Sequence, residues 1–209
     1  MKRGAISVVG LAAVLAIWCD HAAAQATSSI QAGAIDQLQS GSGNRQQMRM
    51  GNAAGSASSN VAVGSVVQTQ SGMSNRQQLD IGNATDFGST KVNLGSIVQQ
   101  QSGTMNVQTA AIGNVSGGGR ADVHVGSLVQ DQSGVVNTQQ ARIGNVSGSG
   151  SSRVDVGPIV QTQSGAFASE SVDVGNSDDD GNTDVTVGGG IYQAQRSMMG
   201  ASHVGIGNR

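Results

Sequence analysis

Few residues in this sequence have the side chains and the spacing that catalysis or metal binding requires. The acidic run at 178–184 (DDDGNTD) has the spaced carboxylates and the glycine that can wrap a calcium ion. An acidic, solvated loop that discourages sideways aggregation explains the same run, and we favour it because the matching loops elsewhere lack the motif. His124 and His203 stand at unrelated positions, with no carboxylate or nucleophile in a catalytic pattern. We therefore expect no enzyme activity, no metal site and no cofactor.

Amide side chains, in contrast, recur at a fixed interval. The segment at 95–106 (GSIVQQQSGTMN) has close copies 31 residues earlier, at 64–75, and 31 residues later, at 126–137. A period of this length is the signature of stacked supersecondary units. Six units follow one another, starting near Ile30, Val61, Val92, Val123, Val154 and Val185.

The same amide occupies the same position in unit after unit, which predicts an interior where like side chains stack. A buried amide can hydrogen-bond to its own copies one rung away, whereas a buried amide without a partner costs about 1–3 kcal/mol. Other positions, such as Ala62 and its copies, accept any side chain and are expected to face water. The predicted stacking ladder comprises Gln37, Gln39, Asn44, Asn52, Gln68, Gln70, Asn75, Asn83, Gln99, Gln101, Asn106, Asn114, Gln130, Gln132, Asn137, Asn145, Gln161, Gln163 and Asn176.

The patterning inside a unit is typical of strands. Apolar and variable residues alternate from Val61, and Gly64 then breaks the phase, which indicates a bulge or a corner between two short strands. The composition predicts a turn at 71–74, a second alternating arm at 75–83 and a loop at 84–91. We therefore predict an all-β protein, a β-solenoid of six strand–turn–strand rungs with a 31-residue repeat and cross-β stacking.

The first 24 residues differ from the array that follows them. A basic end at 2–3, an apolar run at 5–17 and three alanines at 22–24 have the pattern of a secretory signal peptide. We expect residues 1–24 to be removed and the mature repeat domain to comprise residues 25–209. A retained anchor is the lesser alternative, because the apolar run is too short to span a bilayer.

The composition of the expected mature chain excludes several classes of protein. It has no Cys and no Trp, so no disulfide holds it together although it is exported. Without Lys2, Arg3 and Asp20, nine basic and twelve acidic residues remain, a net charge of −3. No basic field exists to attract nucleic acid or anionic lipid.

The two ends of the array predict self-association. A single unit has too few aliphatic side chains to fold alone, so stability has to come from stacking. Only residues 25–29 precede the first unit and only Arg209 follows the last, which leaves no room for a cap. Open strand edges at both ends would be a template for the next molecule. We therefore expect a homopolymer.

The fifth unit departs most from the others, and we expect it to restrain assembly. Pro158 replaces the Ser of the break and removes a backbone donor, Ala168 replaces an Asn, and Glu170 replaces a Gln. Such residues act as gatekeepers against uncontrolled β-aggregation. The predicted gatekeepers are Pro158, Glu170, Asp173, Asp178, Asp179 and Asp180.

The hexapeptide Gln-x-Gly-x-x-Asn recurs in register at 39–44, 70–75, 101–106 and 132–137. It resembles the curlin repeat of bacterial curli fibres, although the unit here is longer, with an added Val-x-Val-Gly arm and a long loop. The resemblance implies an extracellular functional amyloid on the bacterial surface, used for biofilm matrix, adhesion and colonisation. It also implies export through an outer-membrane secretion channel and a nucleating minor subunit as partners.

A monomeric β-solenoid stalk of a surface adhesin is the alternative that the repeat leaves open. Such a stalk would share the period and the stacked core, because both follow from the solenoid alone. It would differ in remaining monomeric in buffer, whereas a fibre subunit would elongate.

Overall fold

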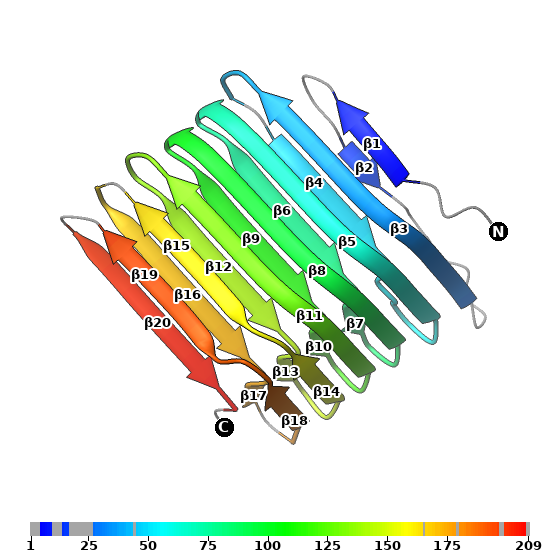
Figure 1. Ribbon diagram of the computed structural model, residues 1–209. Coiled ribbons are helices and arrows are strands. Elements are labelled where there is room, and N and C mark those ends of the chain that lie inside the picture. Colours follow the sequence, from blue (N-terminus) through cyan, green and yellow to red (C-terminus); the bar gives the residue numbers. More distant parts are fainter. Residues whose placement is uncertain are drawn as a thin grey trace.

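The computed structural model describes residues 27–43, 45–164, 166–178, 180–196 and 199–207, together with the backbone of 5–9 and 14–16. The strands of this part of the chain stack in parallel as a β-solenoid of about six turns (Figure 1). Neighbouring turns pair with an offset of 31 residues, as in Val61↔Val92 and Val92↔Val123, and of 32 residues in part of the last turn, as in Ile159↔Ile191. This repeat confirms the predicted fold class. No helix within these ranges is long and apolar enough to cross a membrane.

The first sheet contains the long arm of every turn. In the first four turns the arm is one continuous strand, whereas in the last two turns it is divided into two short strands. The continuous strands are β3 (Thr27–Ser40), β5 (Ser58–Met73), β8 (Ser89–Thr104) and β11 (Arg120–Ser133). The divided arms are β14 (Ser151–Val156) with β15 (Ile159–Ser164), and β18 (Asn182–Val187) with β19 (Ile191–Arg196).

The second sheet contains the returning arm of every turn. Its strands are β4 (Arg45–Met50), β6 (Arg76–Ile81), β9 (Val107–Ile112), β12 (Thr138–Ile143), β16 (Ala168–Val174) and β20 (Gly200–Ile206). At the N-terminal edge, β1 (Ala5–Val9) pairs with β3 and β2 (Val14–Ala16) pairs with β4. Both of these short strands lie within the predicted signal peptide, the rest of which lies outside the described residues.

A third, narrow sheet replaces the loop that the sequence predicts after the second arm. It consists of the two-residue strands β7 (Ala84–Thr85), β10 (Val115–Ser116), β13 (Val146–Ser147) and β17 (Ser177–Asp178). Ala84, Val115 and Val146 are all buried in the core. The second, third and fourth turns therefore have three strands each, because an apolar residue at the start of the loop extends the core column.

The glycine that breaks the strand phase lies at an unpaired step inside β5, β8 and β11. The pairing of β5 with β8 skips from Val63↔Leu94 to Ser65↔Ser96, and the unpaired residues between them are Gly64 and Gly95. A Cβ atom on Gly95 would lie 2.2 Å from the carbonyl oxygen of Gly64, so a side chain has no room there. The alternation of buried and outward residues shifts by one residue at this step, so Val63 and Val66 on its two sides both face the interior.

Pro158 coincides with the break between β14 and β15. It stands where the earlier turns have Ser65, Ser96 and Ser127, all of which lie inside a continuous strand. Because proline has no N–H, the fifth arm cannot continue its backbone ladder through this position. The predicted donor loss therefore appears as a divided strand.

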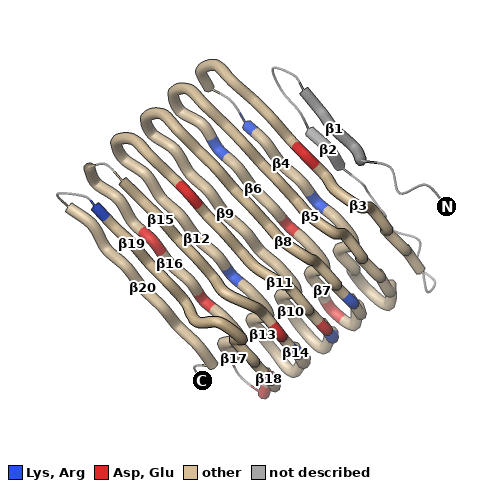
Figure 2. Tube along the Cα trace, in the orientation of Figure 1, with Lys and Arg blue, Asp and Glu red and all other residues tan. Residues whose placement is uncertain are grey.

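The core runs the length of the solenoid as columns of aliphatic side chains. Val61, Val66, Leu79 and Ile81 are each 0% exposed, and their counterparts in the third turn are at most 2% exposed. Charged residues are few along the trace of the chain (Figure 2). The apolar side chains of each turn are buried only where a neighbouring turn packs against them.

Candidate functional site: stacked amide ladders

The Gln37 column forms an unbroken ladder of side-chain hydrogen bonds through the interior. Each later residue donates from Nε2 to Oε1 of the copy before it. The distances are 2.8 Å for Gln68 to Gln37, for Gln99 to Gln68, for Gln130 to Gln99 and for Gln161 to Gln130, and 2.7 Å for Gln193 to Gln161. The ladder is polar, because every donor points toward the N-terminal end of the stack.

The Gln39 column repeats this arrangement two residues further along the strand. The distances run from 3.0 Å for Gln70 to Gln39, through 2.9 Å for Gln101 and Gln132, to 3.1 Å for Gln163 and 3.3 Å for Gln195. Both columns are buried as far as the fifth turn. Removing one amide would leave a donor and an acceptor unpaired in the two adjacent turns.

A third glutamine ladder lies on the opposite arm and was not included in the predicted set. Gln77 donates to Gln46, Gln108 to Gln77 and Gln139 to Gln108, each at 3.1 Å. Each of these amides also donates to a backbone carbonyl of the first sheet, for example Gln77 to Gln100 at 3.2 Å. The third ladder therefore links the two arms of the solenoid as well as successive turns.

The Asn52 column forms a ladder of a different kind at the corner after the second arm. The side-chain oxygen of each Asn accepts the backbone N–H of the next copy, at 2.8 Å for Asn83, 2.9 Å for Asn114, 3.0 Å for Asn145 and 2.8 Å for Asn176. Asn83 and Asn114 also donate from Nδ2 to the preceding Oδ1, at 3.1 Å and 3.0 Å. This column fixes the corner because one side chain replaces a backbone acceptor there.

The Asn75 column does not form the amide ladder that the sequence predicts. Both amide atoms of Asn75 lack a hydrogen-bond partner among the described residues, as does Oδ1 of Asn106 and of Asn137. Asn106 donates to the carbonyl of Ser133 at 3.2 Å, and Asn137 donates to that of Gly134 at 2.8 Å. A short side chain directly after a turn reaches the turn carbonyls more easily than its own copy. Asn44 lies outside the described residues.

The third ladder stops at the fifth turn, where Glu170 stands in the glutamine position. Glu170 pairs with Gln139 in the strand register and is only 1% exposed. Neither of its carboxyl oxygens has a partner among the described residues, and Oε1 of Gln139 has none either. Burial raises the pKa of Glu170 to about 7.

The core is uncovered at the last described turn. Val204 and Ile206 occupy the same columns as the fully buried Leu79 and Ile81, yet they are 43% and 47% exposed. At the other end, Nε2 of Gln37 is buried and has no partner among the described residues. The first described turn therefore has a hydrogen-bond donor without an acceptor, Nε2 of Gln37, and the last has exposed apolar side chains, Val204 and Ile206.

Of the other predicted gatekeepers, those that the structure describes lie on the outside. Asp173 points away from the core and lies 3.5 Å from Nε2 of His203. Asp178 and Asp180 are exposed, and Asp179 lies outside the described residues. In the described ranges no group of three or more His, Cys, Asp or Glu side chains is arranged to hold a metal ion.

Two exposed ion pairs also join residues one turn apart. We did not predict a carboxylate partner for His124 from the sequence. Nδ1 of His124 lies 3.0 Å from Oδ2 of Asp155, its counterpart one turn later. Arg153 and Asp184 form the next such pair at 3.8 Å. Because these side chains are exposed, each pair adds little stability.

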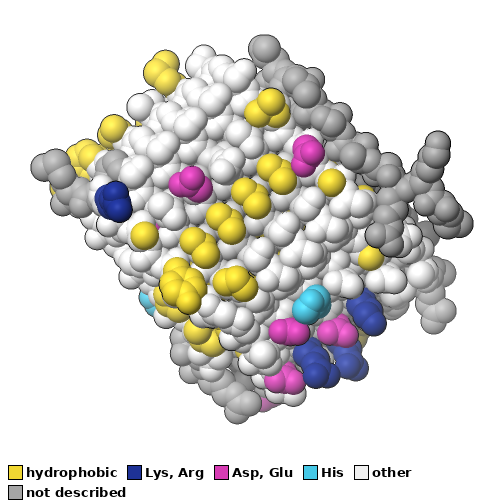
Figure 3. Space-filling model, in the orientation of Figure 1, with side chains coloured by type: hydrophobic (Ala, Val, Ile, Leu, Met, Phe, Trp, Pro, Cys, Tyr) yellow, Lys and Arg dark blue, Asp and Glu magenta, His cyan; other side chains and the backbone are white. Residues whose placement is uncertain are grey.

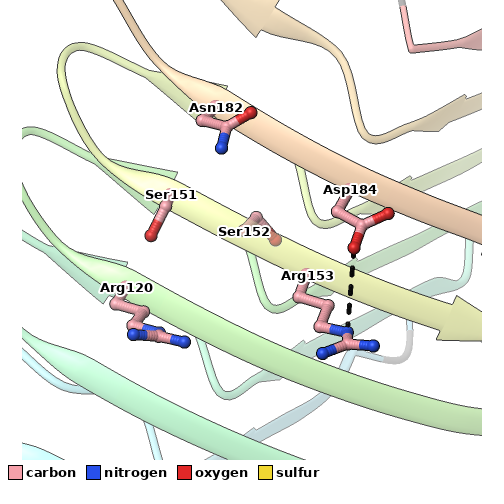
Figure 4. Close-up of a pocket in the computed structure, with 6 residues that line it drawn as sticks. All are labelled: Arg120, Ser151, Ser152, Arg153, Asn182 and Asp184. Atoms are coloured by element: carbon pink, nitrogen blue, oxygen red, sulfur yellow. Dashed lines mark ion pairs between the residues drawn. The ribbon is translucent and has the colours of Figure 1, made fainter.

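One shallow pocket opens beside these pairs, where β11, β14 and β18 begin (Figure 4). Arg120, Ser151 and Asn182 occupy equivalent positions in three successive turns and line it, together with Ser152, Arg153 and Asp184. Its volume is about 360 Å³. The lining offers hydrogen bonds and one exposed ion pair, and it is separate from the glutamine ladders.

The outer face of the first sheet carries a row of apolar side chains (Figure 3). The row consists of the outward, half-exposed Val67, Val98, Val129 and Val160 and the exposed Tyr192. The polar and apolar columns of the interior and of the outer face thus share one period. Searches of protein-family models, curated proteins and solved structures found no match to the chain.

Proposed function

We propose that the chain is a secreted structural subunit that polymerises end to end into extracellular, curli-like amyloid fibres. The observation that carries this proposal is the polarity of the glutamine ladders together with their incomplete ends. Gln37 keeps an unpaired Nε2 donor in the first described turn, and Gln193 places an amide oxygen in the same column of the last. A carbonyl oxygen has two lone pairs, so Gln193 Oε1 can accept a second hydrogen bond.

The apolar columns support the same head-to-tail contact. Met48 and Met50 share the columns of Val204 and Ile206, through the intervening copies on β6, β9, β12 and β16. If β4 of one molecule paired with β20 of another, the two methionines would cover the exposed valine and isoleucine. Burying such side chains contributes about 1.5–3 kcal/mol each, and the backbone edge would gain hydrogen bonds as well.

The predicted signal peptide bears on when this contact becomes available. In the full chain β1 and β2 pair with β3 and β4. Removal of residues 1–24 would make β3 and β4 the edge strands. Export would then coincide with exposure of the N-terminal docking edge.

The biological setting belongs to the proposal and rests on the curlin resemblance. The fibres would form on the bacterial surface and serve biofilm matrix, adhesion and colonisation. A nucleating minor subunit and an outer-membrane secretion channel would be the partners besides the chain itself. A structural role of this kind involves no catalysis and no bound cofactor.

Incubation of purified residues 25–209 tests the proposal directly. We expect unbranched fibres to appear after a lag, with a β-sheet circular dichroism spectrum and shortening of the lag by preformed seeds. A species that stays monomeric and folded would instead support the adhesin stalk. A chain that never becomes ordered would overturn both functions.

A pair of variants in the last turn tests the end-to-end contact itself. Val204→Asp places a charge on the exposed core column of β20, and we expect small amounts of it to stop the growth of wild-type fibres. Tyr192→Asp is the control, because Tyr192 is also exposed in the last turn but points outward from the sheet. Equal effects of the two variants would contradict docking through the β20 edge.

A further inference from the structure

We propose that Glu170 is a proton-operated link in the third glutamine ladder, so that the last two turns join the stack fully only when its carboxyl group is neutral. The link would make fibre assembly acid-dependent. The acid dependence of assembly rests on the proposed polymer. The protonation-dependent link itself concerns the fold of the single chain.

The direction of the ladder decides what Glu170 has to do. In the earlier turns the later residue donates to Oε1 of the earlier one, as Gln139 does to Gln108 at 3.1 Å. Glu170 pairs with Gln139 and so stands in the donor position. The waiting acceptor, Oε1 of Gln139, is buried and has no partner among the described residues.

The protonation state determines whether Glu170 can fill that position. A neutral carboxyl group has one O–H donor, which can supply the missing hydrogen bond to Gln139. An ionised carboxylate has acceptors only, so it would place negative charge against the unpaired oxygen of Gln139 in a buried site. The neutral acid therefore continues the ladder, and the carboxylate interrupts it.

The next turn gives the carboxylate no compensation. Glu170 pairs on its other side with Ser202 of β20. The hydroxyl of Ser202 donates to Oε1 of Gln193 rather than to Glu170. Both carboxyl oxygens of Glu170 consequently lack a donor among the described residues.

No charged side chain in the described ranges shares the interior with Glu170. The inward residues facing it from β12, β15 and β20 are neutral: Gln139, Gln161, Gln163 and Ser202. The nearby charged or titratable side chains, Arg142 on β12, Asp173 on β16 and His203 on β20, occupy the opposite, outward face. With no cation to stabilise the carboxylate, burial raises the pKa of Glu170 to about 7.

The chain allows a direct test, because Glu170 is its only glutamate. Residues 25–209 labelled with ¹³C at the glutamate carboxyl would give one resonance, which can be titrated by NMR in the soluble chain and in the assembled state. We expect a titration midpoint near 7, because burial raises the pKa of Glu170 to about 7. A midpoint close to that of a solvated glutamate, about 4.3, would overturn the proposal whether or not fibres form.

Assembly kinetics test the consequence for the polymer. We expect the wild-type lag to be several-fold longer at about pH 8 than at about pH 5.5, because only the lower pH leaves the carboxyl neutral. Glu170→Gln supplies a permanent donor and should make the lag nearly independent of pH in this range. His203→Asn is the control for histidine titration and should keep the wild-type dependence.

The outcomes separate the two steps. A Glu170→Gln variant whose lag keeps the full wild-type pH dependence would contradict the link. Loss of that pH dependence in His203→Asn but not in Glu170→Gln would contradict it too. If no variant forms fibres at either pH, the polymer proposal fails, and the NMR midpoint still decides the protonation state of Glu170. A raised midpoint would then support a proton-operated fold without assembly.

Discussion

Gln101 donates a hydrogen bond from Nε2 to Oε1 of Gln70 at 2.9 Å, across 31 residues of sequence. Gln132 donates to Gln101 in the same way, so each inward glutamine is bonded on both sides. Gln100, the adjacent residue, is exposed on the outer face of the same strand. Two neighbouring residues of one type therefore have opposite environments, and this difference makes the ladder testable.

Gln101→Ala should weaken the fibres and slow their elongation. The change leaves the acceptor of Gln70 and the donor of Gln132 unpaired in the interior, at about 1–3 kcal/mol each. Gln100→Ala should change little, since it removes only a solvated amide. The measurement is the midpoint of denaturant-induced fibre dissociation, with the elongation rate alongside. Equal effects would show that the ladder does not stabilise the stack.

Gly95→Ala should disrupt the third turn. Its Cβ atom would lie 2.2 Å from the carbonyl oxygen of Gly64, a contact that only a shift of the backbone can relieve. We expect a loss of about 1–3 kcal/mol, the range found where an added side-chain group forces the backbone to shift. Gly188→Ala is the matched control in the same column, because the nearest atom to its Cβ, the carbonyl oxygen of Val156, is 3.9 Å away. If both variants lowered the midpoint temperature of thermal unfolding equally, the close approach of Gly95 to the carbonyl oxygen of Gly64 would not explain the effect.

Glu170→Gln combined with Ala168→Asn should shorten the lag before fibres appear. Glutamine restores the donor that Gln139 lacks, and it removes a buried acid from the fifth turn. We expect Glu170→Gln alone to account for nearly all of the effect. Ala168→Asn alone should leave the lag almost unchanged, because the Asn75 column forms no side-chain ladder. A double variant with an unchanged or longer lag at matched concentration would show that this turn does not restrain assembly.

The stability of the folded chain should fall as the pH rises from about 4.5 to about 7. Burial raises the pKa of Glu170 from 4.5 to about 7, so between these values the folded state binds a proton that the unfolded state has lost. The stabilising effect is complete below the lower value and is lost as the pH passes the upper one. The shift corresponds to about 3 kcal/mol. Denaturant titrations across this range should show a clearly larger fall in the wild type than in Glu170→Gln, which keeps only the smaller contribution of Asp80, whose pKa burial also raises.

The repeat made the fold predictable from the sequence. Val61, Gln68 and Gln70 keep their residue type in copy after copy, and a stacked interior is the physical reason for such identity. The phase break at Gly64 likewise predicted that residues on both sides of it face the core, as they do. These features could be inferred because each depends on contacts that the period itself defines.

Other features could not be inferred, because they depend on distances that the period does not contain. Asn75 recurs in four successive units, yet its amide forms no hydrogen bond to its copies, whereas the amide of Asn83, at a different corner, donates to its own copy. Gln77 keeps its residue type in the first four units, so the third ladder could have been predicted as far as Gln139. The strand β7 was hidden in a polar loop, and only Ala84 with its apolar counterparts Val115 and Val146 indicated it.

Fibre diffraction and electron microscopy of assembled residues 25–209 test whether successive molecules stack end to end along the fibre. If turns stack along the fibre axis, the pattern should show a meridional spacing of about 4.7–4.8 Å. A molecule of six turns should then advance the fibre by roughly 29 Å, with no gap in the ladder between molecules. A chain that stays monomeric, or fibres whose strands are not perpendicular to the axis or whose molecular repeat differs from six turns, would contradict end-to-end stacking.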